Sequence, residues 1–128
     1  VVTAACGGGI SSPSPARSAK CPVGVPFDGT VDDHGALTLT GPSGAVEAGD
    51  AFFAPTCLTG APSGTLTLTV KNTGKLLHNV SVPAQSIDVD VAAGQTITVK
   101  ITVGAEPISY FCKYHRTSGM LGAIVPGR

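Results

Sequence analysis

Cys112-Lys-Tyr-His115-Arg-Thr-Ser-Gly119-Met120, near the C-terminus of this 128-residue chain, is the stretch that decides its fold. A thiol, an imidazole and a thioether fall within nine residues there, directly after the strand-like run Ile108-Ser-Tyr-Phe111. Cys112 would close that strand, His115 would lie on the following loop, and Met120 would stand where the next strand begins. Gly119 allows a tight turn before Met120 because it has no Cβ. A short loop can therefore bend three donors around one ion.

A fourth donor has to come from a strand that is distant in sequence, and His78 is the only suitable histidine. Two imidazoles, one thiolate and one weak thioether form the ligand set of a mononuclear blue-copper electron-transfer site. The thiolate suits Cu(I) and imidazole binds both oxidation states, so such a site can exchange one electron with little rearrangement. We therefore predict one copper ion, held by His78, Cys112, His115 and Met120.

The motifs resemble those of the cupredoxins, most closely the plastocyanin-like branch. The resemblance covers roughly residues 45–128 and rests on two segments, Asn72…His78-Asn79-Val80 and Phe111-Cys112-x-x-His115-x-x-x-Gly119-Met120-x-Gly122. It implies a Greek-key β-sandwich, a type 1 copper ion and outer-sphere electron transfer. It also implies a supporting role for Asn79, whose side chain would tie the two ligand loops together while its backbone N–H points at the thiolate.

Other chemistries fit the sequence less well. A structural zinc site needs two further Cys or His ligands at matching spacing, and a Cys–His protease pair needs a third orienting group. Neither is evident in the sequence. Binuclear copper would require a second cysteine in the loop, and multicopper oxidases require His-x-His pairs, whereas this chain has three histidines. The third, His34, is expected to be a solvated turn residue, and we expect no enzymatic activity.

Composition favours one small all-β domain. Hydrophobic residues make up 42% of the chain and charged residues only 12%, with 17 Gly and 10 Pro. Few charges, many turn residues and abundant Val and Thr are typical of a β-sandwich rather than a helical domain. No apolar run approaches the roughly 18 residues that a membrane helix requires. The formal net charge of zero gives nucleic-acid binding no electrostatic support.

Short apolar or alternating runs, separated by turn residues, predict a cupredoxin-like Greek-key sandwich of seven or eight strands. The expected strands are residues 36–40, 51–54, 65–70, 76–82, 87–91, 96–103, 108–112 and 121–125. Residues 1–20 are rich in Gly, Ser and Pro and predict a flexible tether. The cupredoxin domain is therefore expected at residues 21–128.

The other three cysteines bear on the compartment. Cys21 and Cys57 flank strand-like segments outside the copper loop, and a disulfide between them would imply an oxidising compartment. Free buried thiols are the alternative. Cys6 follows small residues and precedes a Gly/Ser/Pro-rich stretch, a pattern that resembles a bacterial lipobox and linker. We name Cys6 as a lipidation candidate, with a signal peptide missing upstream. An unlipidated Cys6, or its pairing with Cys21 or Cys57, stays open.

Charge is distributed unevenly along the chain. Residues 1–70 carry two basic and five acidic side chains, a net charge of −3, and residues 71–128 carry six basic and three acidic ones, a net charge of +3. Lys113 and Arg116 flank the predicted copper loop, with Tyr114 between them. These three residues are predicted to form a mildly basic docking rim that steers an acidic redox partner. Ordinary solvated charge is the alternative.

The function expected from these features is one-electron transport outside the cytoplasm. The protein would be periplasmic or at the cell surface, secreted or anchored through a lipidated Cys6, and monomeric. Its partners would be redox proteins such as a cytochrome or an oxidase, and the loop residue His115 would be the exposed electron port. Two alternatives stay open, a copper carrier or chaperone without redox turnover and a fixed subunit of a respiratory or oxidase assembly. A carrier would more often show several methionines, and this chain has one.

Overall fold

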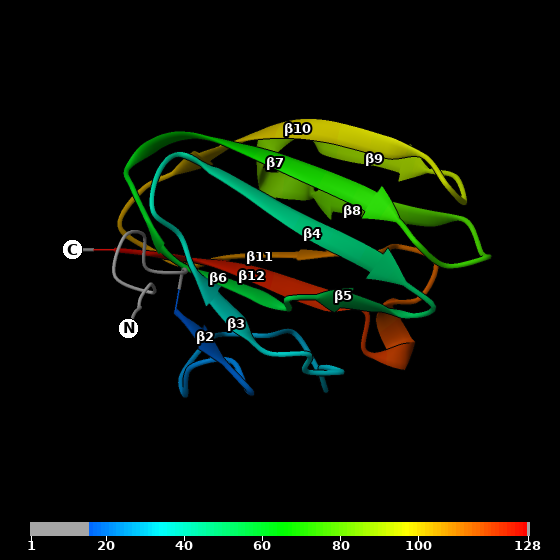
Figure 1. Cartoon of the computed structure of the whole chain (residues 1–128), viewed down its shortest axis with the longest axis horizontal. Coiled ribbons are helices and arrows are strands. Elements are labelled where there is room, and N and C mark those ends of the chain that lie inside the picture. The colour runs from blue at the N-terminus through cyan, green and yellow to red at the C-terminus, as the bar shows by residue number, and fades with distance from the viewer. Residues whose placement is uncertain (1–15, 128) are drawn as a thin grey trace, which may run out of the picture.

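Two β-sheets pack against each other in the computed structural model, which describes residues 16–127 (Figure 1). The smaller sheet has the spatial order β10 (Thr96–Val103), β7 (Gly64–Asn72), β4 (Ser43–Gly49) and β5 (Phe52–Ala54). The larger sheet has the order β2 (Arg17–Ser18), β3 (Ala36–Thr38), β6 (Cys57–Ala61), β12 (Leu121–Pro126), β11 (Ile108–Phe111), β8 (His78–Val82) and β9 (Ile87–Val91). The all-β sandwich predicted from the sequence is confirmed.

The chain passes repeatedly from one sheet to the other. It crosses between β3 and β4, between β5 and β6, between β6 and β7, between β7 and β8, and on both sides of β10. Such crossings place strands that are distant in sequence side by side, as in Greek-key arrangements. The described residues contain no α-helix, only the 3-10 helices η2 (Pro83–Gln85) and η3 (Arg116–Ser118). No helix in this part of the chain is long and apolar enough to cross a membrane.

The core lies between the sheets and follows from the alternation in β7 and β10. Leu66, Leu68 and Val70 of β7 point inward and are buried, while the threonines between them are more exposed. β10 pairs with β7 in antiparallel register, with Val99 opposite Leu68 and Ile101 opposite Leu66. Each strand therefore presents one apolar face to the core and one polar face to solvent.

The described residues form eleven strands, more than the seven or eight that the sequence predicts. All eight expected runs contain a strand, and the additional ones are β2, β4 and β6. β4 is built mainly of glycine and alanine, and β6 contains Gly60 with a φ of +67°. Glycine and alanine interrupt the apolar alternation in β4 and β6, and β2 is only two residues long, so the sequence does not indicate these strands. Arg17 and Ser18, which fall in the expected tether, pair with β3. Residues 1–15, including Cys6, lie outside the described residues.

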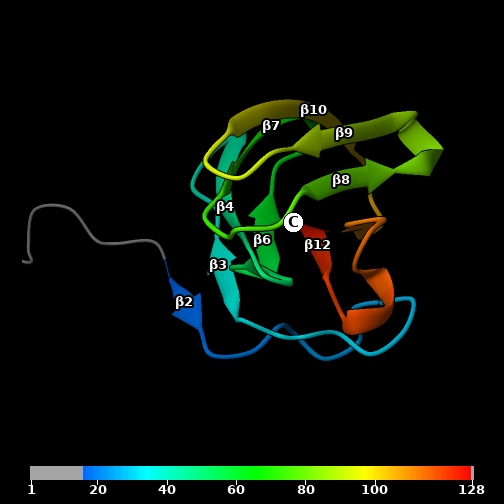
Figure 2. The ribbon, with the colours of Figure 1, turned by 90° about the vertical axis from the view of Figure 1, so that its right-hand side faces the viewer.

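The predicted disulfide is confirmed. Cys21 and Cys57 are joined by an S–S bond of 2.06 Å, and Cys112 is the free cysteine of residues 16–127. Cys57 opens β6, so the bond fixes one end of residues 21–35, which we call the strap. Figure 2 shows the strap running out to η3 and back to β3. Near η3 the backbone N–H of Asp32 donates to the carbonyl of Gly119 at 2.9 Å.

Candidate metal centre

The four predicted donor residues belong to neighbouring segments of the larger sheet, because β11 lies between β8 and β12. His78 is the first residue of β8, Cys112 directly follows β11, and Met120 directly precedes β12. The backbone N–H of Cys112 donates to the carbonyl of Met120 at 3.1 Å, which closes the intervening segment into a loop. His115 lies within it. We call residues 112–120 the donor loop.

Three of these donors point toward a common position. The Sγ atom of Cys112 lies 3.5 Å from Nδ1 of His115 and 3.9 Å from Nδ1 of His78, and the two Nδ1 atoms are 3.2 Å apart. His78, Cys112 and His115 offer ligand atoms that all lie within 4.8 Å of one another, a cluster that could hold one metal ion. A soft sulfur with two imidazoles suits a copper ion.

The donors differ sharply in exposure. His78, Cys112 and Met120 have no solvent-exposed surface, whereas His115 is partly exposed. Of these four residues, His115 is therefore the one through which solvent reaches the site. Burial raises the pKa of the Cys112 thiol, although the backbone N–H groups of Tyr114, His115 and Asn79 oppose that rise. Since a metal binds the thiolate, loading the site would release the Cys112 proton.

Asn79 joins three parts of the site through its side chain. The residue is fully buried beside His78, and its Oδ1 accepts from the backbone N–H of Lys113 at 3.2 Å and from the hydroxyl of Ser81 at 2.5 Å. Its Nδ2 donates to Asp88 at 2.8 Å and to Asp90 at 3.0 Å. The Asn79 amide therefore connects β8, β9 and the donor loop. Its backbone N–H also faces the Cys112 sulfur.

The three polar residues of the expected docking rim all contact acidic groups. Lys113 forms an ion pair with Asp88 at 3.0 Å, the Tyr114 hydroxyl donates to Asp90 at 2.8 Å, and Arg116 pairs with Asp28. The pKa of Asp88 lies below its usual range because of Lys113 and then Asn79, and the pKa of Asp90 is lowered by Tyr114 and then Asn79. The rim thus carries less free positive charge than the sequence suggests.

Exposed apolar side chains precede His78 and His115 in the chain. Leu76 and Leu77, 49% and 45% exposed, directly precede His78, and Tyr114, 45% exposed, directly precedes His115. Few other large apolar side chains are this exposed in the described part of the chain.

His34 lies apart from the cluster of His78, Cys112 and His115. Its ring stacks on Phe52 with centroids 3.8 Å apart, and its Nε2 is 3.1 Å from Asp32, so it is less solvated than expected.

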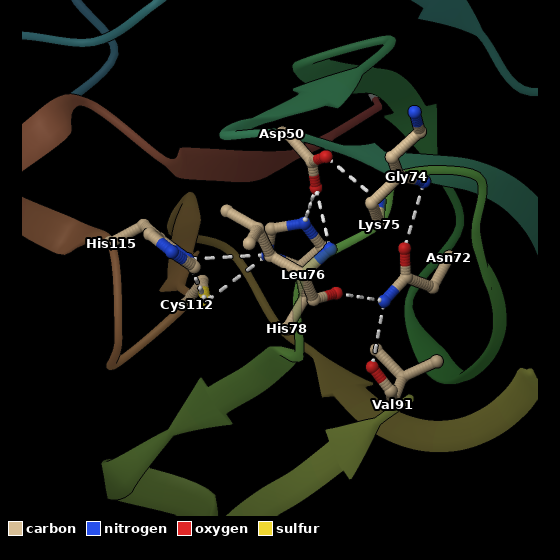
Figure 3. A network of polar contacts seen from close by, with 9 residues as sticks. All are labelled: Asp50, Asn72, Gly74, Lys75, Leu76, His78, Val91, Cys112 and His115. Atoms are coloured by element: carbon tan, nitrogen blue, oxygen red, sulfur yellow. Dashed lines mark hydrogen bonds and ion pairs between the residues drawn. The ribbon is translucent and has the colours of Figure 1, made fainter. Parts of the chain in front are cut away.

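Asp50 is a residue of the site that the sequence did not reveal. It lies in the turn between β4 and β5, and its Oδ1 is 2.6 Å from Nε2 of His78 (Figure 3). Its pKa is lowered by the backbone N–H of Lys75 first, and also by His78. An aspartate after a glycine is typical of any solvated turn, and nothing local distinguishes this one.

Comparisons with known proteins bear on the fold. No protein-family model matches the sequence, and a search of curated proteins finds no match. Among solved structures, reduced auracyanin from Roseiflexus castenholzii is similar at a TM-score of 0.56 and 20% identity, over 68% of this chain and 98% of that one. Oxidised plastocyanin from Dryopteris crassirhizoma gives 0.53 and 16%, over 65% and 99%. The chain has the cupredoxin fold.

A third similar structure comes from a membrane transporter. It is the metal-binding domain of the Cu(I)-exporting P-type ATPase CopA of Streptococcus pneumoniae D39, solved with Cu(I). The TM-score is 0.56 at 9% identity, over 77% of this chain and 93% of that one. Auracyanin and plastocyanin are matched over nearly their whole length, so about a third of this chain lies outside the shared cupredoxin core.

Proposed function

We propose that this chain is a type 1 copper protein that carries single electrons between redox partners. The observation that carries the proposal is the convergence of Cys112 Sγ with two imidazole Nδ1 atoms at one end of a cupredoxin fold. The residues that would hold the ion are His78, Cys112, His115 and Met120, with the Met120 thioether as the weakest donor. A copper ion bound by this set supplies a one-electron couple.

Residues of the chain would support one-electron exchange by fixing the donors and shielding them from water. Cys112 would give up its proton on loading, and full burial shields His78 and Met120 from water. Backbone hydrogen bonds fix the donor loop from within, since the N–H groups of both Cys112 and Met120 are engaged. A site whose donors move little between oxidation states needs little reorganisation when an electron arrives or leaves.

Docking would use the exposed side chains of Leu76, Leu77 and Tyr114, which precede His78 and His115 in the chain, together with the exposed part of His115. The proposal is that these side chains form one patch with His115, since contiguous exposed apolar patches mark interaction sites. Steering by Lys113 and Arg116 would be weak, since each cation is already paired with an aspartate. The two leucines and the tyrosine therefore carry the docking proposal, with the cations at its border.

The location proposed is outside the cytoplasm. The Cys21–Cys57 disulfide supports an oxidising compartment. Anchoring through a lipidated Cys6 is proposed from the sequence around that residue alone. If the anchor exists, the native protein partitions with membranes and Cys6→Ala releases it to the soluble fraction. Membrane partitioning that persists in Cys6→Ala would refute the anchor.

A copper carrier without redox turnover is the second candidate, favoured by the similarity to the CopA domain solved with Cu(I). The two functions differ in how they treat oxidised copper. An electron carrier holds Cu(II) and Cu(I) in the same site and cycles between them. A Cu(I) carrier shows no stable Cu(II) form with a thiolate bond.

The test is the visible absorption spectrum of the copper-loaded, oxidised protein. We expect an intense blue colour from thiolate-to-copper charge transfer, reversibly bleached by a reductant. Cys112→Ser should abolish the band while leaving the far-UV circular dichroism of the sandwich unchanged. A colourless wild type after verified Cu(II) loading would reject the type 1 assignment, and a protein that retains only Cu(I) would favour the carrier.

A further inference from the structure

We propose that Asp50 is a positioning residue for His78, one that fixes the tautomer of its imidazole and favours the oxidised state of the bound ion. The inference rests on the proposed function and deepens it. Asp50 Oδ1 lies 2.6 Å from His78 Nε2, on the side of the ring opposite the donor cluster (Figure 3). The His78 side chain is fully buried, so this carboxylate takes the place that water would occupy beside an exposed ring.

The Asp50 carboxylate determines which ring nitrogen of His78 carries the proton. A neutral imidazole carries one N–H, and an ionised carboxylate can only accept. At 2.6 Å from Asp50 the proton of His78 must therefore be on Nε2, which leaves the Nδ1 lone pair facing Cys112 and His115. Metal-binding histidines commonly donate their other N–H to such a partner, which orients the ring and raises its basicity.

The Asp50 carboxylate is itself fixed in place. The backbone N–H of Lys75 donates to Oδ2 at 2.8 Å, and that of Leu76 donates to Oδ1 at 3.2 Å. Two backbone donors and one imidazole therefore converge on a single side chain. Because Lys75 and Leu76 lie in the segment that leads into β8, the Asp50 carboxylate holds both this segment and the His78 ring.

The neighbouring loop is shaped to admit this carboxylate. A Cβ on Gly74 would overlap the Asp50 carboxylate, so glycine leaves the space that the carboxylate fills. The amide of the buried residue Asn72 holds the loop, accepting from the Gly74 N–H at 2.9 Å and donating to the carbonyls of Leu76 and Val91 at 2.8 and 2.9 Å. The arrangement is therefore built from several residues rather than being a chance surface contact.

A negative charge next to a ligand stabilises the more highly charged form of the ion. Removing Asp50 should therefore weaken Cu(II) binding more than Cu(I) binding, and the reduction potential should rise. The Asp50 side chain is 32% exposed, so solvent screens part of its charge. Loss of a group that hydrogen-bonds to a metal ligand typically lowers metal affinity by about 10–100-fold.

Asp50→Asn and Asp50→Ala separate the charge from the hydrogen bond. Asparagine keeps an oxygen that can accept from Nε2–H but lacks the charge, and alanine removes both. We expect Asp50→Ala to lower Cu(II) affinity by about 10–100-fold, with a smaller loss for Cu(I). Each tenfold difference between the two losses raises the potential by about 59 mV. Asp50→Asn should fall between Asp50→Ala and the wild type.

The matched control is Glu47→Gln. Glu47 is exposed on β4, three residues before Asp50, and its substitution changes the net charge by the same amount. Wild-type affinities and potential are expected for this variant. A potential that shifts equally in Glu47→Gln and Asp50→Asn would overturn the proposal, because net charge alone would then explain it. Unchanged affinities in both Asp50 variants would overturn it as well.

A second readout needs no copper. Nitrogen-15 NMR of the metal-free protein distinguishes the two histidine tautomers, and His78 should be the Nε2–H form in the wild type and Asp50→Asn. In Asp50→Ala the other tautomer should become populated. If the loaded wild type lacks the blue band but this tautomer change is seen, the proposed function fails while the positioning role stands. An identical tautomer in all three proteins would remove the positioning role.

Discussion

The two imidazoles of the site are held in opposite ways. His78 is fully buried at the start of β8, is paired across the sheet with Val91, and donates its outer N–H to Asp50. His115 is partly exposed and lies on the donor loop, where its backbone bonds only to other residues of that loop. One half of the cluster is therefore built by the sheet and the other by a loop.

This difference suggests a division of labour between the two halves. The His78 half resists rearrangement because strand pairing and the Asp50 carboxylate fix its position. The His115 half must be supported from outside, and the strap provides that support where Asp32 meets Gly119 and Asp28 meets Arg116. Rigid geometry would come from the first half and contact with partners from the second.

Deleting each imidazole gives the largest effect. His115→Gly and His78→Gly should both lose the blue band completely, since each removes an equatorial nitrogen donor. Added imidazole should restore the band in His115→Gly, because that position borders solvent. It should not restore the band in His78→Gly, where the ring is enclosed and its exposed fraction is 0%. Visible absorption during an imidazole titration measures the recovery of the blue band in both variants.

The same two titrations can contradict this comparison of His78 with His115. Equal recovery in both variants would mean that the buried position admits solutes as readily as the exposed one. No recovery in His115→Gly, with the sandwich still folded by circular dichroism, would mean that His115 is not an open port. Either result would contradict the division of labour.

Removing the disulfide should have the next largest effect. The bond spans 36 residues, a loop for which the chain-entropy model gives about 3–4 kcal/mol of stabilisation. Cys21→Ala with Cys57→Ala should lower the free energy of unfolding in urea by that amount. It should also loosen the strap and broaden the blue band, while the His78 tautomer stays unchanged. A band of wild-type width would contradict the supporting role of the strap.

The donor loop was predictable because its three donors lie within nine residues of one another. Spacing alone indicated a shared ion, and the family resemblance added Asn79. The eight expected strands were found because large apolar residues alternate in them, most clearly in β7. The Cys21–Cys57 pair was favoured because both residues flank strand-like segments outside the loop, although the sequence alone left a pairing with Cys6 open.

Contacts that depend on three-dimensional neighbours were not predictable. Asp50 is 28 residues from His78 in sequence, and only the crossing between sheets brings them together. The partners of Lys113 and Arg116 are likewise distant, 25 and 88 residues away. Sequence charge counts placed basic side chains beside the loop but gave no means of knowing that each would meet an aspartate.

Gly119 offers a smaller and more local test of the strap. Its φ is +94°, and a Cβ there would lie 2.9 Å from the backbone nitrogen of Asp32. Gly119→Ala combines left-handed backbone strain of about 1–2 kcal/mol with an overpacking cost of about 1–3 kcal/mol against the strap. Gly94→Ala is the matched control, since Gly94 has a φ of +80° and no heavy atom within 4 Å of its Cβ position.

Urea unfolding of the two alanine variants isolates the contact with the strap. Gly119→Ala should be the less stable variant, and its copper spectrum should change, whereas that of Gly94→Ala should match the wild type. If the two variants lose the same stability and share a spectrum, the strap yields freely and does not support the loop.

The smallest effect concerns the ion pair that joins the donor loop to β9. Lys113 and then Asn79 hold the pKa of Asp88 below its usual range, so this carboxylate stabilises the fold above its unfolded pKa of about 3.9. That stabilisation is lost as the pH falls through the lower pKa of Asp88 in the folded state.

The variant Asp88→Asn tests this: it keeps an acceptor for Asn79 but removes the charge. Thermal midpoints should therefore be slightly lower for Asp88→Asn near neutral pH and should converge with the wild type in acid. Because Asp88 is largely exposed, added salt should shrink the difference. Glu106→Gln is the control: Glu106 is exposed before β11 and belongs to none of the ion pairs of residues 16–127. A difference for Asp88→Asn that persists unchanged in acid would mean that packing, and not the charge of Asp88, ties the loop to β9.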